Sequence, residues 1–314
     1  MSNGGFTLGI DTSNYTTSVA IIGPSGELVA NLKSPLTVKA GERGLRQSDA
    51  VFMHVKNLPE LMTRVKEILG GRSISRVGVS TRPRNLDGSY MPCFLSGVAV
   101  AESISAAMNI PLYKYSHQCG HVMAALYSSG RFDLLDGRDF CAFHVSGGTT
   151  EMLRVSAVNG GFSASVVGEA ADINAGQLID RVGVLMGLPF PAGPHMERLA
   201  LQNTAKIPKR KPTATDLRVN MSGIENLAER LYRETGSPEL VSAYVLEYVS
   251  NSLILLAEGY EDRFGKADFV FAGGVMSNSI IKEKIAKRFC ASFAEPALSA
   301  DNAVGIAALA AREP

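Results

Sequence analysis

Hydrophobic and polar positions follow the same order in two stretches of the chain, and each stretch predicts three short strands. Residues 6–32 read as strand, polar turn, strand, turn and strand, and residues 140–168 repeat that order. In both stretches an apolar strand runs into a turn of Gly, Ser, Thr or Asp, and a hairpin brings the chain back. Two such stretches predict two related lobes rather than one continuously wound sheet.

The segments that follow these stretches carry apolar residues at helical spacing. Helices are predicted over 48–69, 96–108, 238–262, 279–289 and about 302–312, with one more strand at 267–274. Ser237 is placed to cap the long helix, with Pro238 at its first position. The basic, proline-containing stretch 204–220 is expected to be a solvated surface loop rather than a specific RNA site. The pattern therefore predicts a two-lobed α/β protein.

The composition narrows the class of protein. The chain has 314 residues, 46% hydrophobic and 19% charged, a length that suits about two domains. Lys and Arg number 31 against 30 Asp and Glu, so any RNA contact must depend on a local patch. The four cysteines have no paired spacing, which indicates reduced thiols. Without a signal-like N-terminus, and with apolar stretches far shorter than a membrane span, we expect a cytoplasmic protein with no membrane contact.

Two turns rich in glycine and hydroxyl groups are candidate anion sites. The first follows the opening strand and comprises Asp11, Thr12, Ser13 and Asn14. The second has the equivalent place in the repeat and comprises Ser146, Gly147, Gly148, Thr149 and Thr150. Backbone N–H groups at glycines can point outward and hydroxyls add donors, so two such turns across a cleft could hold a polyphosphate or an acyl phosphate. A plain hairpin turn is the alternative for each, and no P-loop or dinucleotide glycine pattern is present.

Other polar residues near turns are weaker candidates. Gly273 and Gly274 end the strand at 267–274 and precede Asn278, which could contact a base or ribose or simply belong to a tight strand-to-helix turn. Asp172 and Asp180 lie eight residues apart, so on a helix they share a face only loosely. Asp180 is the better candidate for a ligand contact, because an apolar run and the loop PFPAGPH follow it.

Three histidines and one aspartate form a candidate metal site. His117 and His121 are four residues apart, which places both imidazoles on one face of a helix start, with the preceding serine as its expected cap. His144 lies two residues before the second glycine turn, so strand geometry points it to the same face as that turn. Asp301, at the head of the last helix, would add a carboxylate, a set that suits iron or zinc better than magnesium. Two surface histidines are the alternative.

In their order along the chain, these motifs resemble those of the universal tRNA threonylcarbamoyladenosine transferases, once labelled glycoproteases. The segment LGIDTSNYTTSVAI resembles the family's opening strand and turn, and the family's metal motif falls on His117 and His121. The family's phosphate turn falls on HVSGGTTEM, its helix and ligand loop on GEAADINAGQLIDRVGVLMGLPFPAGP, and its Ser-Gly turn on NMSGIEN. Its nucleoside turn and closing metal-ligand helix fall on FAGGVMSN and SADNAVGIAALA. The resemblance is collinear over nearly the whole chain.

The resemblance implies an α/β actin/hexokinase/Hsp70-like (ASKHA) fold, with two duplicated lobes and a central ligand cleft. The implied lobes are 1–137 plus 300–314, with the metal site, and 138–299, with the nucleotide-binding turns. One divalent iron or zinc ion is implied, with His117, His121, Asp301 and His144 as its ligands. Threonylcarbamoyl-AMP, or ATP, is implied to contact Ser146, Gly147, Gly148, Thr149, Asp180, Gly193, Gly273, Gly274 and Asn278, with possible first-lobe phosphate contacts at Asp11, Thr12 and Ser13.

The activity implied is transfer of the threonylcarbamoyl group to an adenosine beside the tRNA anticodon. The implied partners are tRNA, a smaller paralogue and an ATPase, in a homo- or heterodimer. The chain departs from the family's pattern at 14–17, at 81–92, at Thr149 in place of a histidine and at Glu225 in place of a lysine.

The departures leave alternatives open. One is a divergent paralogue that carbamoylates an acceptor other than tRNA, and another is a non-catalytic scaffold of the same fold. Retention of His117, His121 and Asp301 argues against the scaffold, because the resemblance implies that the family's scaffolding paralogue lacks these ligands. A sugar kinase of the same fold ranks last, since it predicts a catalytic Asp and no histidine pair. Arg82 and Arg84 could meet either RNA phosphates or a small acidic acceptor.

Overall fold

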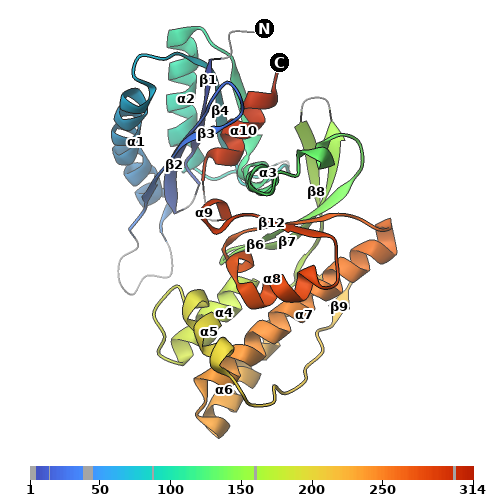
Figure 1. Ribbon diagram of the computed structural model, residues 1–314. Coiled ribbons are helices and arrows are strands. Elements are labelled where there is room, and N and C mark those ends of the chain that lie inside the picture. Colours follow the sequence, from blue (N-terminus) through green and yellow to red (C-terminus); the bar gives the residue numbers. More distant parts are fainter. Residues whose placement is uncertain (1–4, 14, 38–44, 87, 159–160, 300–301) are drawn as a thin grey trace. The chain divides into compact units, whose positions relative to one another are not determined.

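A computed structural model of the protein describes residues 5–13, 15–37, 45–86, 88–158, 161–299 and 302–314. Contacts between residues divide the chain into two compact units, and each unit is made of segments that are not continuous in the sequence. Unit 1 comprises Met1–Leu135, Val158–Ser163 and Ala297–Pro314, and unit 2 comprises Asp136–Ala157 and Ala164–Pro296. Figure 1 labels the helices and strands of both units.

Unit 1 is built on a five-stranded sheet in the order β3-β2-β1-β4-β5. Its strands are β1 (Phe6–Asp11), β2 (Thr16–Ile22), β3 (Leu28–Pro35), β4 (Ile74–Arg82) and β5 (Leu112–Ser116). Its helices are α1 (Gln47–Leu69), α2 (Phe94–Met108), α3 (His117–Ser129), the short η1 (Phe132–Leu135) and α10 (Val304–Arg312). The first three strands pair antiparallel, whereas β4 runs parallel to both β1 and β5. The helices α1 and α2 cover one face of the sheet, and α3 and α10 lie on the other (Figure 1).

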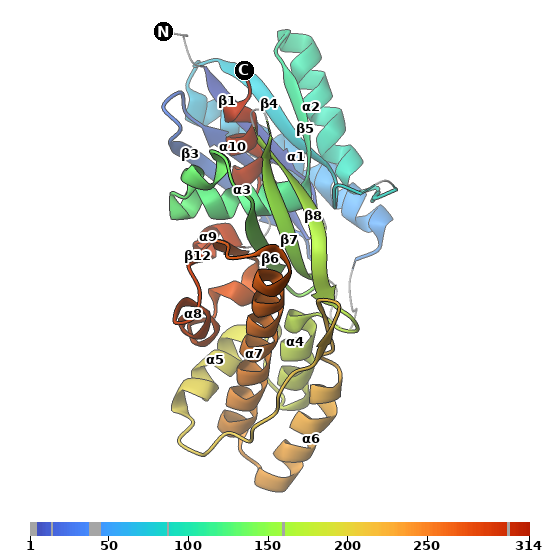
Figure 2. The ribbon, with the colours of Figure 1, turned by 90° about the vertical axis from the view of Figure 1, so that its right-hand side faces the viewer.

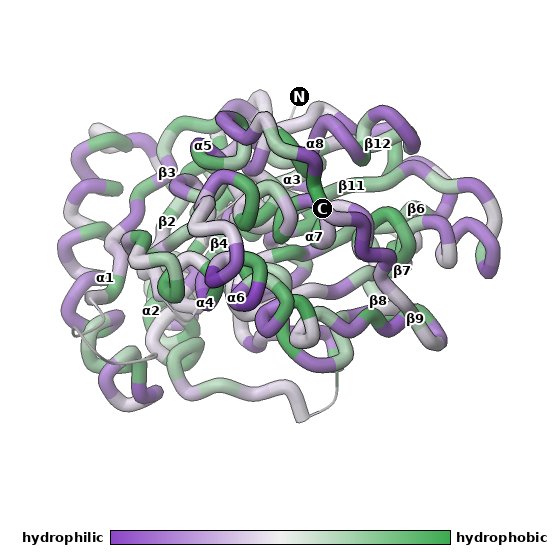
Figure 3. The backbone as a smooth tube through the Cα atoms, turned by 90° about the horizontal axis from the view of Figure 1, so that it is seen from below, coloured by the Kyte–Doolittle hydropathy of each residue, from purple (hydrophilic) through white to green (hydrophobic). Residues whose placement is uncertain are grey.

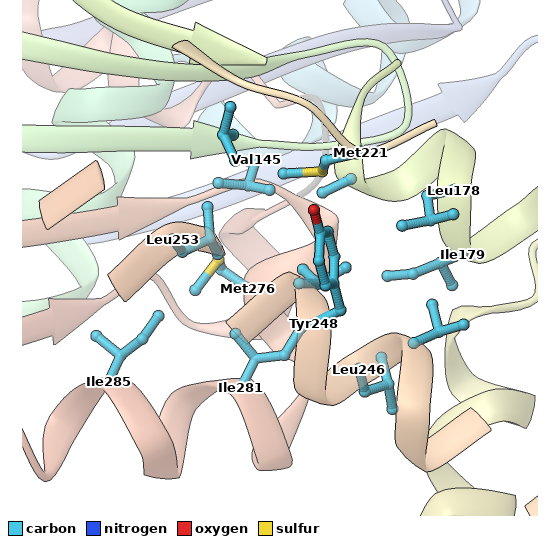
Figure 4. Close-up of a cluster of buried hydrophobic side chains, with 14 of the residues drawn as sticks. Val145, Leu178, Ile179, Met221, Leu246, Tyr248, Leu253, Met276, Ile281 and Ile285 are labelled. Carbon is cyan, nitrogen blue, oxygen red and sulfur yellow. The ribbon is translucent and has the colours of Figure 1, made fainter. Parts of the chain in front are cut away.

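Unit 2 is built on a seven-stranded sheet in the order β12-β11-β6-β7-β8-β10-β9. Its strands are β6 (Phe140–Val145), β7 (Thr150–Val158), β8 (Gly161–Ala170), β9 (Ala214–Thr215), β10 (Arg218–Val219), β11 (Phe269–Ala272) and β12 (Ala291–Phe293). Its helical elements are α4 (Ala175–Leu185), α5 (Gly193–Gln202), α6 (Gly223–Thr235), α7 (Pro238–Phe264), η2 (Gly274–Ser277) and α8 (Ser279–Ala286). The short α9 (Pro296–Ser299) begins at the last residue of unit 2 and belongs otherwise to unit 1. The core of unit 2 gathers around α7, where Tyr248 and Leu253 point among apolar side chains of α4 and α8 (Figure 4).

The local sequence signals produced the expected elements. Both three-strand stretches form, as β1 to β3 and as β6 to β8. The hydroxyl of Ser237 accepts a hydrogen bond from Leu240 N (3.2 Å), and Ser116 does the same for Cys119 N (3.2 Å), which confirms both predicted N-caps. Around α1 the hydrophobic and hydrophilic residues alternate as the helical spacing requires (Figure 3).

Three expectations about the elements need correction. The strand at 267–274 stops at Ala272, because Gly273 has a φ of +99° that turns the chain. The stretch 204–220 is not wholly a loop, since β9 and β10 form within it and pair with each other. Asp172 does not lie on a helix with Asp180, because α4 begins only at Ala175.

The expectation that every apolar stretch is far shorter than a membrane span is wrong for α7. This helix has 27 residues and a mean hydropathy of 1.5 over its most apolar window, enough to cross a membrane by length and composition. However, 78% of that window is buried, and Val241, Val245 and Leu256 are among its fully buried side chains. The packing therefore makes α7 the core helix of unit 2.

The last helix of unit 1 fixes the position of α3 at a very close contact. A Cβ added to Gly305 of α10 would lie 1.8 Å from the carbonyl oxygen of Gly120 in α3. On its other side α10 approaches the sheet closely, since a Cβ on Gly9 of β1 would lie 2.6 Å from Ala303 O. Because only glycine permits these approaches, α3 is held against the sheet through α10.

Candidate functional site

The histidine pair lies in the first two turns of α3, directly after β5. His117 and His121 are one turn apart, and their Nε2 atoms face each other at 2.9 Å. The ring centroids are 4.4 Å apart, with an angle of 78° between the planes. His121 is 4% exposed, so this ring is almost completely enclosed in unit 1. Two imidazole nitrogens that converge in this way can bind one metal ion together.

A buried carboxylate orients the first of these histidines. Asp11, at the end of β1, is fully buried, and its Oδ2 lies 2.8 Å from His117 Nδ1. Three further groups donate to the same carboxylate: Ser13 N (3.0 Å), Ser13 Oγ (3.2 Å) and Ser80 Oγ (2.5 Å). Since Nδ1 donates to Asp11, the lone pair of neutral His117 is on Nε2, the atom that faces His121. This donor set fits a metal ion held by two imidazoles and oriented by a carboxylate behind them.

The other two proposed metal ligands, Asp301 and His144, stay predictions. Asp301 lies outside the described residues. His144 belongs to unit 2, where it is 7% exposed on β6. Its partners in the sheet are Ala272 of β11 and Glu151 of β7, and Glu151 is only 3% exposed. Within the described part of the chain no group of three His, Cys, Asp or Glu residues is placed to hold a metal. The four-residue metal site stays a prediction.

The hydroxyls of the first turn have partners inside unit 1. Thr12 Oγ1 donates to the carbonyl of Cys93 (3.0 Å) and accepts from Gly97 N (3.1 Å), so it joins the end of β1 to the start of α2. Ser13 uses its hydroxyl on Asp11. Both side chains are buried, and their contact with a phosphate stays a prediction.

The glycine turn of unit 2 presents its backbone to open space. Ser146 N donates to Thr149 O (2.7 Å), which closes the turn between β6 and β7. A Cβ on Gly147 or Gly148 would meet no heavy atom within 4 Å. In contrast, a Cβ on Gly176, at the start of α4, would lie 2.6 Å from Ser146 O. The N-terminus of α4 therefore packs directly against the turn, and its first N–H groups are used there, since Ala175 N donates to Thr150 Oγ1 (2.8 Å) and Gly176 N to Ser146 O (3.2 Å). Backbone donors of the kind that bind anions are offered by the turn itself, at Gly147 and Gly148.

A second turn lies beside this one at the edge of the same sheet. The strands β6 and β11 are parallel neighbours, and a Cβ on Gly273 would lie 2.3 Å from the carbonyl oxygen of Val145. Asn278 is 7% exposed and its Oδ1 accepts from Ile281 N (3.1 Å), so it caps α8. Gly274 has no heavy atom within 4 Å of its Cβ position. The carboxyl ends of two adjacent strands thus bring together two of the predicted nucleotide-binding segments.

Asp180 and Gly193 lie at one junction of unit 2. Asp180 Oδ1 accepts a hydrogen bond from Ala192 N (2.8 Å), immediately before α5 begins at Gly193. Burial raises the pKa of Asp180, and the Ala192 N–H counteracts this in part. On α5, Glu197 Oε1 accepts from Ser279 N (2.7 Å), the residue next to Asn278. Hydrogen bonds from backbone N–H groups to the Asp180 and Glu197 carboxylates therefore connect α4, α5 and the Asn278 turn around one region.

Sequence reasoning named Asp172 and Glu225 but missed the contacts by which they hold this region together. Burial acts to raise the pKa of Asp172, but hydrogen bonds from Met221 N, Ser222 and Ile173 N outweigh it and lower that pKa. Asp172 thereby fixes the Ser-Gly turn before α6. Glu225, where the resemblance has a lysine, forms an ion pair with Arg181 of α4 (3.0 Å). No local pattern marks the contacts of Asp172 with Met221 and Ser222 or of Glu225 with Arg181, because each joins residues more than forty positions apart.

A pocket of about 200 Å³ lies in unit 1 next to α3. Its lining includes Arg82, from the segment 81–92 that departs from the family's pattern. Asn85, Lys114, Tyr115, Cys119 and Glu313 are among its other lining residues. Arg82 Nη2 donates to Asn85 Oδ1 (3.2 Å), whose amide donates to Cys119 Sγ (3.1 Å). Burial raises the pKa of the Cys119 thiol, so it stays protonated at neutral pH.

The fold places the protein among ASKHA proteins, the actin- and hexokinase-like class. An activator of the 2-hydroxyisocaproyl-CoA dehydratase from Clostridium difficile, with bound ADPNP, is similar over 98% of this chain and 94% of its own (TM-score 0.55, 13% identity). Component A of the (R)-2-hydroxyglutaryl-CoA dehydratase from Acidaminococcus fermentans is similar over 98% of this chain and 97% of its own (TM-score 0.55, 16% identity). A glucokinase of the ROK family from Streptomyces griseus, in complex with glucose and AMPPNP, is similar over 98% of this chain and 99% of its own (TM-score 0.53, 13% identity). At these identities the likeness shows the fold alone.

The family model described as tRNA N6-adenosine threonylcarbamoyltransferase matches residues 32–308. The protein therefore belongs to this transferase family, which confirms the resemblance read from its motifs.

Proposed function

We propose that the protein transfers the threonylcarbamoyl group of threonylcarbamoyl-AMP to an adenosine of tRNA, with a divalent metal ion bound at His117 and His121. Membership of the transferase family supports the type of reaction. The observation that carries the proposal is the pair of facing Nε2 atoms with Asp11 behind them. A carboxylate that accepts from the far ring nitrogen of a histidine is the usual companion of an imidazole that binds a metal.

Unit 2 supplies the proposed adenylate site. The N–H groups of Gly147 and Gly148 lie at a turn that opens to free space, and the N-terminus of α4 packs behind that turn. Backbone donors and the helix dipole both favour a phosphate there. The Gly273 and Asn278 turn at the next strand end would take the nucleoside, and Asp180 holds the loop before Gly193 in place.

The reaction needs no nucleophilic side chain. The exocyclic amine of the acceptor adenosine forms a bond to the carbamoyl carbon, the bond from that carbon to the phosphate oxygen breaks, and AMP leaves with an amine proton passing to its phosphate or to water. The turn N–H groups stabilise the negative charge that grows on the phosphate. A metal ion, when bound, supplies Lewis acidity. Asp11 keeps the His117 proton on Nδ1, so that Nε2 stays available as a ligand.

The test compares histidine variants with a matched control. His117→Ala and His121→Ala are expected to lose a metal content of about one per chain and to form no threonylcarbamoyladenosine in tRNA, measured by mass spectrometry of its nucleosides. His195 lies on the surface of α5, beside Arg198, so His195→Ala should keep both properties. Unchanged metal content and product in the α3 variants would sink the proposal.

A second candidate is carbamoyl transfer to a small acidic acceptor. It is favoured by the pocket of about 200 Å³, which is too small for a nucleotide and is lined by Arg82 and Lys114. Lys114 is partly neutralised by Glu102 (2.7 Å), which leaves Arg82 as the main cation. Consumption of the donor without any modified tRNA nucleoside, abolished by Arg82→Gln, would favour this candidate over tRNA.

We also propose that α1 and α2 contact a partner protein, either a smaller paralogue or a second copy. Four large apolar side chains are exposed on these helices: Phe52 (70%), Val55 (56%), Leu95 (52%) and Met108 (45%). The two helices contact each other, so these residues belong to one layer of unit 1. Light scattering of the protein alone and with the co-expressed paralogue should show a complex that Phe52→Ser weakens.

A further inference from the structure

The connection between α5 and β9 carries a concentrated positive charge. Residues 203–213 contain four exposed cations and no acidic residue: Lys206, Lys209, Arg210 and Lys211. The whole chain has a net charge of only +1, so the rest of it is acidic overall. A local excess of this kind raises the concentration of polyanions near the surface.

The loop has a defined course although it contains no helix or strand. Ile207 packs, partly buried, against the core of unit 2, and it interrupts the row of cations on the inner side. Pro208 and Pro212 restrict the backbone and lack an N–H. At its start, Asn203 and Ala205 exchange two hydrogen bonds of 2.8 and 3.2 Å. The backbone that carries the cations is therefore held against unit 2 and is not a free tail.

The loop crosses the outer side of α7 (Figure 2). Burial raises the pKa values of Tyr244 and Tyr248, two tyrosines of this helix, while the charge of Arg210 acts to lower both. The charge of Arg230, on α6, also acts on Tyr244. Arg210 and Arg230 therefore both come near Tyr244, but Arg230 is compensated by Glu234 of α6 (3.7 Å), so the uncompensated charge lies on the loop.

Most other described cations of unit 2 have an acidic partner, but those of the loop do not. Arg218 pairs with Glu169 and Arg263 with Asp216, the first acid after the loop. For Lys206, Lys209, Arg210 and Lys211 the described part of the protein provides no ion-pair partner within 4.0 Å. Uncompensated lysines and arginines in a row are well suited to contact successive phosphates.

We infer that this strip, defined as Lys206, Lys209, Arg210 and Lys211, binds the phosphate backbone of RNA. The choice of RNA over other polyanions rests on the proposed function. From Lys206 to Lys211 an extended chain reaches about 16 Å, the length of about five phosphates of one strand. The strip recognises charge rather than sequence, because it offers no rigid pair of donors to a base edge.

The experiment measures tRNA binding without any donor, by anisotropy of fluorescently labelled tRNA at 50 and 200 mM KCl. The strip variant carries Lys206→Gln, Lys209→Gln, Arg210→Gln and Lys211→Gln. The control variant loses the same charge at exposed positions elsewhere, through Lys56→Gln, Arg64→Gln, Lys66→Gln and Lys266→Gln. Four released counterions predict that a fourfold rise in salt weakens wild-type binding about 50-fold more than it weakens binding by the strip variant. The control variant should keep the wild-type salt dependence.

Equal affinity and equal salt dependence in the strip variant and wild type would overturn the inference. It is also overturned if the strip variant loses binding to phosphatidylserine vesicles while its tRNA binding is unchanged. Binding of a non-hydrolysable threonylcarbamoyl-AMP analogue is measured in parallel and should be the same in all three proteins. Loss of tRNA binding in the strip variant, together with no analogue binding in any of them, would support the strip while the proposed transferase reaction fails.

Discussion

The contact between α3 and α10 leads to a sharp prediction, because it fixes the helix that carries both histidines. Gly305→Ala would place a methyl group 1.8 Å from Gly120 O and 2.8 Å from Ala124 N, where ordinary contacts are 3.4–4 Å. Both neighbours are backbone atoms of α3, so no side-chain rotation can relieve the clash. The two helices must separate by more than 1 Å, roughly estimated, which disrupts packing on both sides.

The cost can be estimated from two opposing effects. Overpacking of a close-packed interior costs about 1–3 kcal/mol and sometimes more, whereas replacing a helical glycine by alanine gains up to about 1 kcal/mol. We therefore expect Gly305→Ala to lose about 2 kcal/mol of unfolding free energy. Gly223, at the first position of α6, is the control, because its Cβ would meet nothing within 4 Å. Gly223→Ala should leave stability unchanged or raise it slightly.

Urea unfolding followed by far-UV circular dichroism measures both variants, since the chain has no tryptophan for fluorescence. Metal content serves as a second measurement, because a displaced α3 moves His117 away from Asp11, the carboxylate on β1 that orients its ring. If Gly305→Ala unfolds at the wild-type urea midpoint and keeps its metal, the close approach of the two helices does not hold α3, and the reasoning is refuted.

Further predictions concern the two proposed binding regions and a buried histidine. Asp11→Asn keeps the shape of the side chain but removes its charge, so metal affinity should fall about 10- to 100-fold in competition with a chelator; an unchanged affinity would exclude Asp11 as the orienting group. Gly147→Ala adds a methyl group to open space, so its melting temperature should stay within about 1 °C of wild type. The same variant should weaken adenylate-analogue binding at least about 10-fold. In contrast, Gly176→Ala should lower the melting temperature, because its added methyl group would lie 2.6 Å from the turn. Burial lowers the pKa of His54 to about 4, against a smaller opposite effect of Asp11. The unfolded chain then binds a proton below pH 6.5 that the native protein excludes, so stability should fall by on the order of 3 kcal/mol between pH 6.5 and pH 4. His54→Asn should flatten this decline in urea titrations, and an equally steep decline would show that another group causes it.

Local signals explain what the sequence could predict about the fold. The alternating strands, the caps Ser116 and Ser237 and the spacing of His117 and His121 all depend on neighbours within a few residues. The end of β11 escaped prediction because two adjacent glycines do not reveal which of them adopts a positive φ.

The sequence predicted several residues of the candidate site, but not the long-range contacts between them. Sequence reasoning selected Asp11 as a phosphate contact, yet its carboxylate lies against His117, 106 positions away. The role of Ser80, which donates to the same carboxylate, had no local signal. Contacts of this kind follow from the pairing of β1 with β4 and from the position of α3, neither of which a short pattern encodes.

The place of α10 in unit 1 has a consequence for the order of events during synthesis. All of unit 2 leaves the ribosome before Ala297, so it can fold while unit 1 still lacks its last helix. Until Val304–Arg312 emerges, the face of β1 and β4 around Gly9 and Gly78 lacks the cover of α10, and α3 lacks its contact with that helix. The histidine pair, although encoded in the first half of the chain, can therefore reach its final geometry only after α10 has been synthesised. A nascent chain stalled before α10 would then expose an apolar sheet to chaperones and would not bind a metal ion at this pair.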